Sequence, residues 1–325
     1  MKTIVRHLQF SWMSGLFLLI FVSCKKSPSE PVDLRIKQMA HEEVKQMAAT
    51  LEAASTASLK EGLSMSIWAV DSLIIDPISI DMDEEGTLYY TSSGRLGKVE
   101  FDIRGHQDWE IESIGLQSIE EKRAFLRKEL SPERSEFNTW LKDYNGDGSH
   151  DWRDMLEIKE SVYRVKDTNG DGLADWTQKM IEDFHEEVTD IAAAVLKFED
   201  DLYVGVGPDY WKLKDKNGDG IIDEKVSLSH GYGIHIGFGA HGMSGATVGP
   251  DGRIYWAIGD IGFNGVDQTG KQWKYPNRGV VVRANPDGSD FEVFAMGVRN
   301  THEFVFDDYN NLISVDNDGD HRGES

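Results

Sequence analysis

A histidine and an aspartate flank one strand–turn–strand segment in the second half of the sequence. His241 lies in the glycine-rich stretch GAHGMSG, and Asp260 ends the segment ATVGPDGRIYWAIGD. An aspartate can hold an imidazole ring and stabilise its protonated form, so that the histidine can take a proton from a hydroxyl group. We therefore expect His241 to be a base beside Asp260, at one end of the strands. The alternative is a structural loop histidine, and the pair alone does not separate the two.

Three acidic loops containing NGDG or NGDGS repeat one spacing of oxygen-bearing side chains. The spacing matches the first part of a calcium loop, since Ca²⁺ prefers about six to eight oxygen ligands. The twelfth position is Asp154, Gln178 or Val226, and none of these is the glutamate of an EF-hand. Asn-Gly and Asp-Gly also form hairpin turns without an ion, so both readings stay open. The candidate ligands are Asp143, Asn145, Asp147 and Asp151; Asp167, Asn169, Asp171 and Asp175; and Asp215, Asn217, Asp219 and Asp223.

Two kinds of strand pair alternate along the chain. Four copies of the first kind are SIDMDEEGTLYYTSS, AVLKFEDDLYVGVG, ATVGPDGRIYWAIGD and FVFDDYNNLISVDND, with aligned aliphatic residues Leu88, Leu202, Ile254 and Leu312. Their gaps are 114, 52 and 58 residues, and the first gap predicts a hidden or interrupted copy. The second kind is VYRVKDTNGDGLADWTQKMIED, YWKLKDKNGDGIIDEKVSLSHG and VVVRANPDGSDFEVFAMGV. Alternating hairpins at such a period are typical of four-stranded propeller blades.

The N-terminal residues indicate export. An apolar run at residues 10–22 follows Lys2 and Arg6, and it is too short to span a bilayer. The sequence FVSC places a small residue directly before Cys24, as in a bacterial lipobox, which predicts a signal peptide over residues 1–23 and lipidation of Cys24. The alternative is an ordinary or uncleaved signal with an incidental cysteine.

The rest of the chain is expected to have three parts. Residues 24–61 are a tether and a spacer helix, with a helical stripe of Ile36, Ala40, Val44, Met47 and Leu51. Residues 62–325 are the β domain. A helical insertion at about 117–160 lies on one rim, with a capping box at Ser118 and Glu121 and another helix opened by Ser131-Pro132.

Composition narrows the function. The chain has 325 residues, 39% of them hydrophobic, which is enough for a large core, and a net charge of −23, which disfavours nucleic acid as a partner. The single cysteine excludes an internal disulfide or a CxxCH haem motif within these residues.

Three segments carry a resemblance to a known family. HGMSGATVGPDGRIYWAIGD, RANPDGSDFEVFAMGVRN and FVFDDYNNLISVDNDGD, in this order, resemble the soluble quinoprotein glucose and sorbosone dehydrogenases, which are six-bladed β-propellers. The helical insertion and NGDG turns look more narrowly like the propeller of large bacterial membrane-bound dehydrogenase-like proteins. Longer members of that group often continue into a c-type cytochrome domain. The resemblance implies an all-β, six-bladed propeller that is incomplete in these residues.

The resemblance also implies a cofactor and residue roles. His241 takes the place of the catalytic base and Asp260 that of the acidic residue beside the substrate. Arg299 and Asn300 match the pair that contacts pyrroloquinoline quinone (PQQ), and a planar guanidinium suits its carboxylates. The family's calcium region falls on Asp316, Asn317, Asp318 and Asp320. The implied protein is a lipid-anchored exported dehydrogenase for a sugar or related alcohol, which passes electrons to an acceptor such as a c-type cytochrome. The alternative is a non-catalytic glycan-binding or scaffold propeller.

Overall fold

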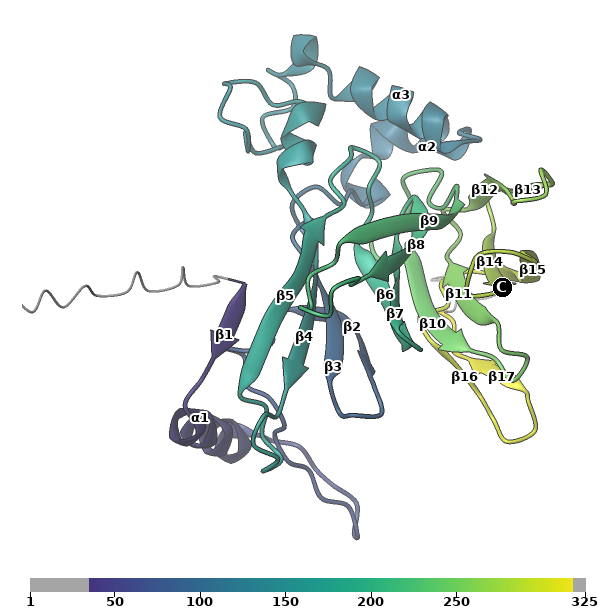
Figure 1. The fold of residues 1–325 in the computed structure, drawn as a ribbon. Helices are drawn as coiled ribbons and strands as arrows, with labels where there is room; N and C mark the ends of the chain where they lie inside the picture. Colours follow the sequence, from purple (N-terminus) through teal and green to yellow (C-terminus); the bar gives the residue numbers. More distant parts are fainter. Residues whose placement is uncertain (1–34, 318–325) are drawn as a thin grey trace, which may run out of the picture. The chain divides into compact units, whose positions relative to one another are not determined.

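The first hairpin of each repeat is present and antiparallel. In the computed structural model, which describes residues 35–317, the four pairs are β2 (Pro77–Met82) with β3 (Leu88–Ser93), β6 (Ala192–Phe198) with β7 (Asp201–Val206), β10 (Met243–Val248) with β11 (Ile254–Ile258), and β16 (Phe304–Phe306) with β17 (Leu312–Ser314) (Figure 1). The four predicted hairpins are confirmed.

The second kind of hairpin extends the first three pairs into meanders. These hairpins are β4 (Glu160–Lys166) with β5 (Trp176–Asp183), β8 (Asp209–Lys214) with β9 (Glu224–His230), and β14 (Gly279–Ala284) with β15 (Glu292–Val298). The meanders run β2-β3-β4-β5, β6-β7-β8-β9 and β10-β11-β14-β15, and the sheet of the first meander has a fifth strand beside β5. The prediction of a mostly β fold is confirmed. A small hairpin of β12 (Phe263–Val266) and β13 (Gln272–Tyr275), between β11 and β14, was not predicted.

Acidic side chains and glycines close the first-type turns. Asp83 Oδ1 accepts a hydrogen bond from the Thr87 backbone N–H at 2.7 Å between β2 and β3. Gly86 follows with φ +80°, and Gly252 has φ +76° in the corresponding turn between β10 and β11. Glycine adopts this left-handed backbone without a Cβ clash. These turns are local in sequence, and this is why the hairpins could be predicted.

The first repeat is long because it contains the helical insertion. Residues 94–159 separate β3 from β4 within a single sheet, so of the two alternatives, a hidden or an interrupted copy, the described residues show an interrupted one. The insertion starts earlier than expected and includes α2 (Glu110–Ile114), α3 (Ile119–Glu129) and 3₁₀ turns at Ile103–Gly105, Gln107–Trp109, Pro132–Arg134 and Trp152–Glu157. Ser118 caps α3 as expected, because its Oγ accepts from the Glu121 N–H at 3.2 Å. The helices of this insertion lie beyond one end of β4 and β5 (Figure 1).

The segment before the first meander holds a strand and a helix. Ile36 was expected on the helix, but it belongs to β1 (Ile36–Gln38), which pairs with β5. The helix α1 (His41–Ala54) begins after Ala40, and it buries Val44 and Ala48. These side chains pack with Leu88 and Val165 of the first sheet. The helix is therefore part of the packed unit that begins at Arg35 rather than a free spacer.

The meanders pack on one another face to face. Tyr89, Val162 and Met180 of the first sheet pack against Val195 and Leu202 of the second. A second core lies between the second and third sheets and includes Tyr203, Tyr210, Trp256 and Val280. The first strands, β2, β6 and β10, lie side by side at one edge of this stack. The middle strand β11 is buried at every residue, which fits a sheet covered on both faces.

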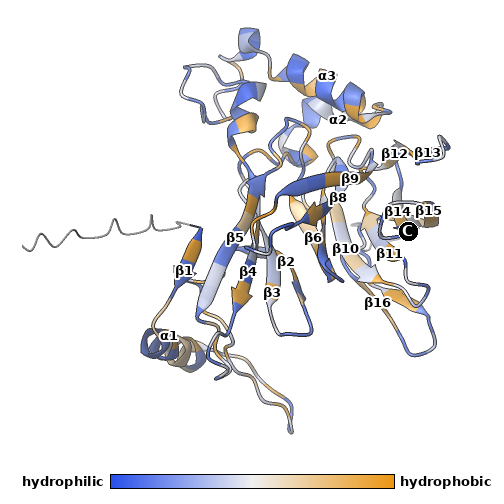
Figure 2. Ribbon diagram, in the orientation of Figure 1, coloured by the Kyte–Doolittle hydropathy of each residue, from blue (hydrophilic) through white to orange (hydrophobic). Residues whose placement is uncertain are grey.

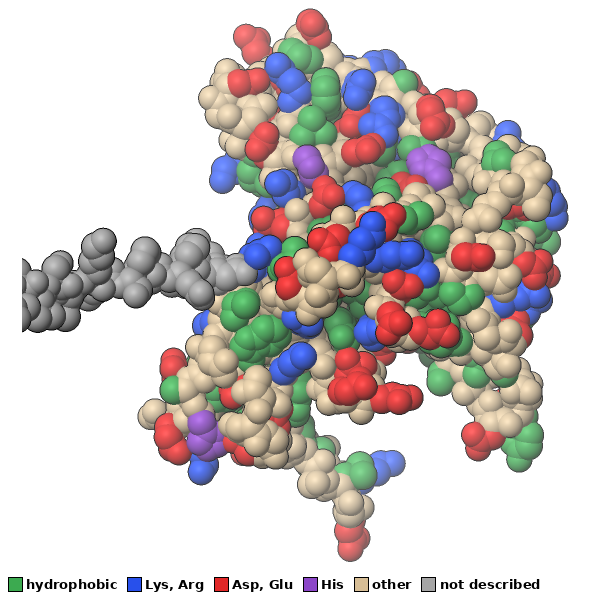
Figure 3. Space-filling model, in the orientation of Figure 1, with side chains coloured by type: hydrophobic (Ala, Val, Ile, Leu, Met, Phe, Trp, Pro, Cys, Tyr) green, Lys and Arg blue, Asp and Glu red, His purple; other side chains and the backbone are tan. Residues whose placement is uncertain are grey.

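Polar and apolar residues are distributed as this packing requires. The helix α3 carries hydrophilic and hydrophobic residues along its length (Figure 2). On the face drawn in Figure 3, acidic, basic and hydrophobic side chains are interspersed. Within residues 35–317, no helix has the length and apolar character to cross a membrane.

Candidate functional site

Strand pairing brings His241 and Asp260 together. Met243 of β10 lies opposite Ile258 of β11, and the Gly259 N–H donates to the His241 carbonyl at 3.1 Å. The side chains then meet, with His241 Nδ1 2.7 Å from Asp260 Oδ1. The His241 side chain is 4% exposed and that of Asp260 is 38% exposed, so solvent reaches the pair from the Asp260 side. Because Asp260 engages Nδ1, the other nitrogen, Nε2, is the one available for proton transfer.

The Arg299–Asn300 segment lies beside this pair. The Asp260 N–H donates to the Arg299 carbonyl at 2.8 Å. Asp316, predicted as a metal ligand, uses its two carboxylate oxygens to accept the N–H groups of Arg299 at 2.8 Å and Asn300 at 2.5 Å. Asn300 is buried, and its Oδ1 has no hydrogen-bond partner among the described residues. An orphaned acceptor beside the pair is suited to a ligand that donates a hydrogen bond.

Two guanidinium groups gather around the aromatic ring next to His241. The Phe238 ring centroid lies 5.6 Å from that of His241. The Cζ atoms of Arg104 and Arg299 lie 5.2 Å and 5.6 Å from the same Phe238 centroid. The Arg104 guanidinium is also paired with Asp102, with 2.6 Å between Nη2 and Oδ2, so Arg299 is the guanidinium that we consider for an anionic ligand at this point.

Two carboxylates from the insertion hold the loop that precedes His241. Asp102 Oδ2 accepts from the Gly239 N–H at 3.0 Å, and Glu100 Oε1 accepts from the Ala240 N–H at 2.7 Å. Ala240 has φ +62°, an uncommon conformation for a residue with a Cβ. Hydrogen bonds to Arg104 hold the pKa of Asp102 well below its usual range, whereas burial raises the pKa of Glu100. The position of the His241 loop thus depends on residues far away in sequence.

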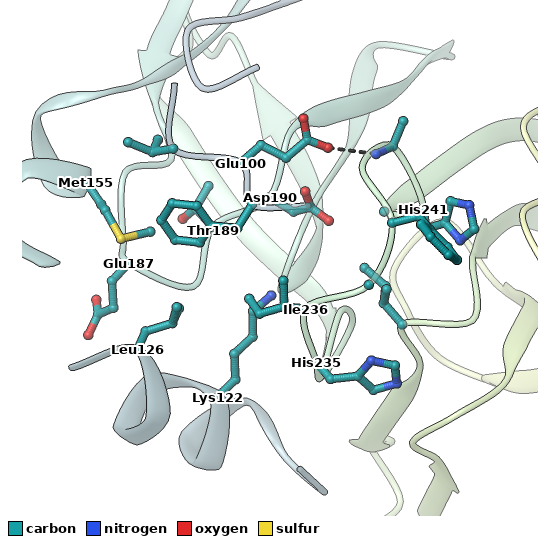
Figure 4. Close-up of a pocket in the computed structure, with 17 residues that line it drawn as sticks. Glu100, Lys122, Leu126, Met155, Glu187, Thr189, Asp190, His235, Ile236 and His241 are labelled. Atoms are coloured by element: carbon teal, nitrogen blue, oxygen red, sulfur yellow. Dashed lines mark hydrogen bonds between the residues drawn. The ribbon is translucent and has the colours of Figure 1, made fainter. Parts of the chain in front are cut away.

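A small polar cavity lies beside the same loop. It has a volume of ≈ 40 Å³ and is lined by Glu100, Lys122, Asp190 and the backbone around His241, among others. That volume suits one or a few water molecules rather than a cofactor. Lys122 of α3 donates to the Gly233 carbonyl at 2.8 Å, and burial lowers its pKa. The His241 ring points away from Glu100, Asp190 and Lys122 (Figure 4).

Sequence reasoning missed the residues that surround His241 from the insertion side. Glu100, Asp102 and Arg104 follow no motif, and no signal in the sequence connects them to His241. Lys122 did leave a signal, because it occupies a helical position between the buried Ile119 and Phe125 where an apolar residue is expected. A lysine is almost never fully buried without a partner, so a lysine on the apolar face of a predicted helix indicates a buried polar contact.

The acidic loops form ordered turns. In each loop the first aspartate, Asp143, Asp167 or Asp215, accepts two glycine N–H groups at 2.6–2.9 Å. The asparagine two residues later accepts an aspartate N–H in the same way. The last two loops join β4 to β5 and β8 to β9, so these two loops are the turns of β-hairpins. Within residues 35–317, no group of three or more His, Cys, Asp or Glu side chains is arranged to hold a metal ion.

The remaining aspartates of these loops support the backbone. Asp175 Oδ1 accepts from the Thr168 N–H at 2.9 Å, and Asp223 Oδ2 accepts from the Lys216 N–H at 2.8 Å. Asp151 instead pairs with Arg153, with 2.6 Å between Oδ2 and Nη2. Cys24, the predicted signal peptide, Asp318 and Asp320 lie outside the described residues.

Replacing Glu100 by glutamine is expected to change the pH dependence of stability. Because burial and the nearby Asp190 raise the folded-state pKa of Glu100, its contribution to stability is present below its ordinary pKa of 4.5 and is lost as pH rises through the raised pKa. A Glu100→Gln side chain keeps an oxygen for the Ala240 N–H but carries no charge. The melting temperature of the variant relative to the wild type should therefore rise between pH 4.5 and neutrality.

Calorimetry across pH checks this, with the exposed Glu84→Gln as the control that leaves the profile unchanged. Parallel profiles for Glu100→Gln and the wild type would contradict the assignment of a destabilising buried charge at this position.

The fold is that of an antiparallel, mostly β protein with an insertion that contacts its candidate site. The chain belongs to a family described as a domain of unknown function, DUF7133, whose model matches residues 49–323. No curated protein matches this chain.

Proposed function

We propose that this protein is a lipid-anchored, exported quinoprotein-like dehydrogenase that oxidises a sugar or related alcohol, built on a six-bladed β-propeller. The observation that carries the proposal is the contact between His241 and Asp260 beside Arg299 and Asn300. Stacked four-stranded meanders whose first strands lie side by side support the propeller.

The chain's own residues have defined tasks in this proposal. Asp260 holds His241 Nδ1 and orients the ring, so Nε2 takes the hydroxyl proton of the substrate. The Arg299 guanidinium favours the carboxylates of an acidic cofactor, and the buried Asn300 Oδ1 can accept a hydrogen bond from it. When bound, PQQ would supply the acceptor for the hydride of the substrate carbon, with Ca²⁺ polarising its carbonyl.

The test is titration of the complete protein with PQQ and Ca²⁺, followed by a dye-reduction screen of sugars and alcohols. Saturable PQQ binding and substrate-dependent dye reduction are expected. An absence of both would reject the dehydrogenase and leave the second reading, a non-catalytic glycan-binding or scaffold propeller. In that reading the His241–Asp260 contact only stabilises the junction of β10 and β11.

We also propose that one or more acidic loops bind Ca²⁺. The first aspartate and the third-position asparagine of each loop already direct side-chain oxygens to the same turn, and an oxygen that accepts one N–H has a further lone pair for an ion. Calcium should raise the melting temperature, by an amount equivalent to about 3 kcal/mol at a hundredfold excess over Kd for one site.

Scanning calorimetry with calcium or a chelator measures this shift. The control is a triple variant, Asp147→Asn, Asp171→Asn and Asp219→Asn, which keeps the turn acceptors but removes one charge per loop. The triple variant should lose most of the rise in melting temperature that calcium causes. Its melting temperature in the presence of the chelator should change little. An equal calcium-induced rise in the wild type and in the triple variant would mean that calcium binds at other residues.

A further inference from the structure

A larger pocket lies on the other side of the loop that contains Thr189. Its volume is ≈ 250 Å³, below the roughly 300 Å³ at which pockets for drug-sized ligands begin. It is bounded by the end of β5, the turn from β7 to β8, the start of β9, and Leu156 of the insertion. The His241–Asp260 pair does not line it. The pocket is thus separate from the site described above and suits a ligand of monosaccharide size.

Aromatic and apolar side chains form much of the pocket wall. Phe184 and Trp211 lie with their ring centroids 5.7 Å apart and their planes inclined by 53°. The Trp211 indole N–H donates to the Val206 carbonyl at 3.3 Å, which fixes the orientation of the ring. Pro208 lines the same pocket. An aromatic surface with a fixed orientation suits the C–H face of a ring-shaped ligand.

The polar groups of the pocket carry both signs of charge. Lys225 Nζ pairs with Asp183 Oδ2 at 2.7 Å, and it lies 4.6 Å from the centroids of both Phe184 and Trp211. Two further N–H groups of this ammonium are available, since it donates only to Asp183 among the described residues. The pairing with Lys225 holds the pKa of Asp183 below its usual range in spite of burial, so the Asp183 carboxylate is ionised at neutral pH.

Asp209 supplies an acceptor that the protein does not use. Its side chain is 12% exposed, and its Oδ1 accepts from Ser227 Oγ at 2.6 Å and contacts His230 Nδ1 at 3.1 Å. In residues 35–317 its second oxygen, Oδ2, has no hydrogen-bond partner. Oδ2 is not among the fully buried side-chain atoms that lack a partner, so it is open to accept a hydrogen bond from water or from a ligand in the pocket.

We propose that this pocket binds a neutral polyhydroxyl ring, that is, a monosaccharide or one sugar unit of a glycan. Hydroxyl groups donate and accept, so they can satisfy Asp209 Oδ2 and the Lys225 ammonium together. An anionic ligand instead meets the carboxylates of Asp183, Glu186 and Asp209, and a cationic ligand meets the Lys225 ammonium. The apolar face of the ring packs on Trp211. The site is a second one and needs neither quinone nor His241.

Titration of the ¹⁵N-labelled chain tests the proposal through its tryptophan indole signals. The Trp211 signal is assigned with a Trp211→Phe variant, and the probes are D-glucose, D-galactose and D-mannose, compared with D-glucuronate and D-glucosamine. At least one neutral hexose should shift the Trp211 signal at millimolar concentration, and the charged analogues should bind more weakly. Asp209→Asn should weaken binding about tenfold, because a charge-assisted hydrogen bond becomes a neutral one.

Matched variants separate this site from the other one. Trp211→Leu should abolish binding, while Trp273→Leu on the β12–β13 hairpin and His241→Ala should leave it unchanged. If Trp211→Leu does not fold, the change in hexose affinity of Asp209→Asn decides whether the sugar binds in this pocket. No shift with any hexose, tighter binding of a charged analogue, or unchanged affinity in Asp209→Asn would overturn the proposal. Because no quinone is present, failure here leaves the dehydrogenase proposal standing, and failure of that proposal leaves this one.

Discussion

Replacing His241 by alanine should, under the proposed function, lower the turnover of the protein titrated with quinone by roughly two to four orders of magnitude, since general-base catalysis contributes about that factor. Quinone affinity should change little, because Arg299 and Asn300 are held by Asp316 rather than by the imidazole. Steady-state dye reduction and a separate quinone titration distinguish the two effects.

The matched control is His150→Ala. The His150 Nδ1 atom contacts the Leu141 carbonyl at 2.6 Å in the helical insertion, so this histidine is also hydrogen-bonded and partly buried. Its removal should leave turnover nearly unchanged. Equal turnover of wild type and His241→Ala on a verified substrate would remove His241 from the mechanism and favour its role as a structural loop residue.

Replacing Trp256 by alanine should cost about 3–5 kcal/mol of unfolding free energy, which is typical for a large aromatic side chain in a core. Trp256 is 1% exposed and stacks on Tyr210 with ring centroids 4.1 Å apart. Its indole N–H donates to the Tyr232 hydroxyl at 3.0 Å, so the substitution also removes one of the two hydrogen bonds of this buried hydroxyl, the other being to Ser229 Oγ at 2.8 Å. The second and third sheets meet at this residue.

Urea denaturation of the chain measures the loss. Phe137→Ala, whose side chain is 77% exposed in the insertion, is the control and should change stability by only about 0.5 kcal/mol. A loss of under about 1 kcal/mol for Trp256→Ala would mean that the contact between these sheets contributes little to stability.

The hairpins could be predicted because their signals are local. Alternating apolar residues, acidic turn residues and glycines such as Gly252 lie within about fifteen residues of one another. The β12–β13 hairpin was missed because its strands, FNGV and QWKY, are only four residues long each. Ile36 was misplaced on a helix because its pairing partner, Gln178 on β5, is far away in sequence.

The candidate site could be predicted in part for the same reason. His241 and Asp260 flank two strands of one hairpin, so antiparallel pairing alone brings them together. Glu100 and Lys122 come from an insertion whose docking is determined by tertiary packing. The pocket at Trp211 and Asp209 combines four separate segments, and single-sequence patterns carry no information about such a combination.

The hydrogen bonds that hold the His241 loop have a kinetic consequence. They join Asp102 to Gly239 and Glu100 to Ala240, across 137 and 140 residues of chain. Contacts of such long range form slowly, because the entropy of closing the intervening loop is lost before they contribute stability. The hairpin of β10 and β11 can form early and alone, but its histidine reaches its final position only after the insertion has docked. Order in this loop therefore reports that a newly made chain has finished folding.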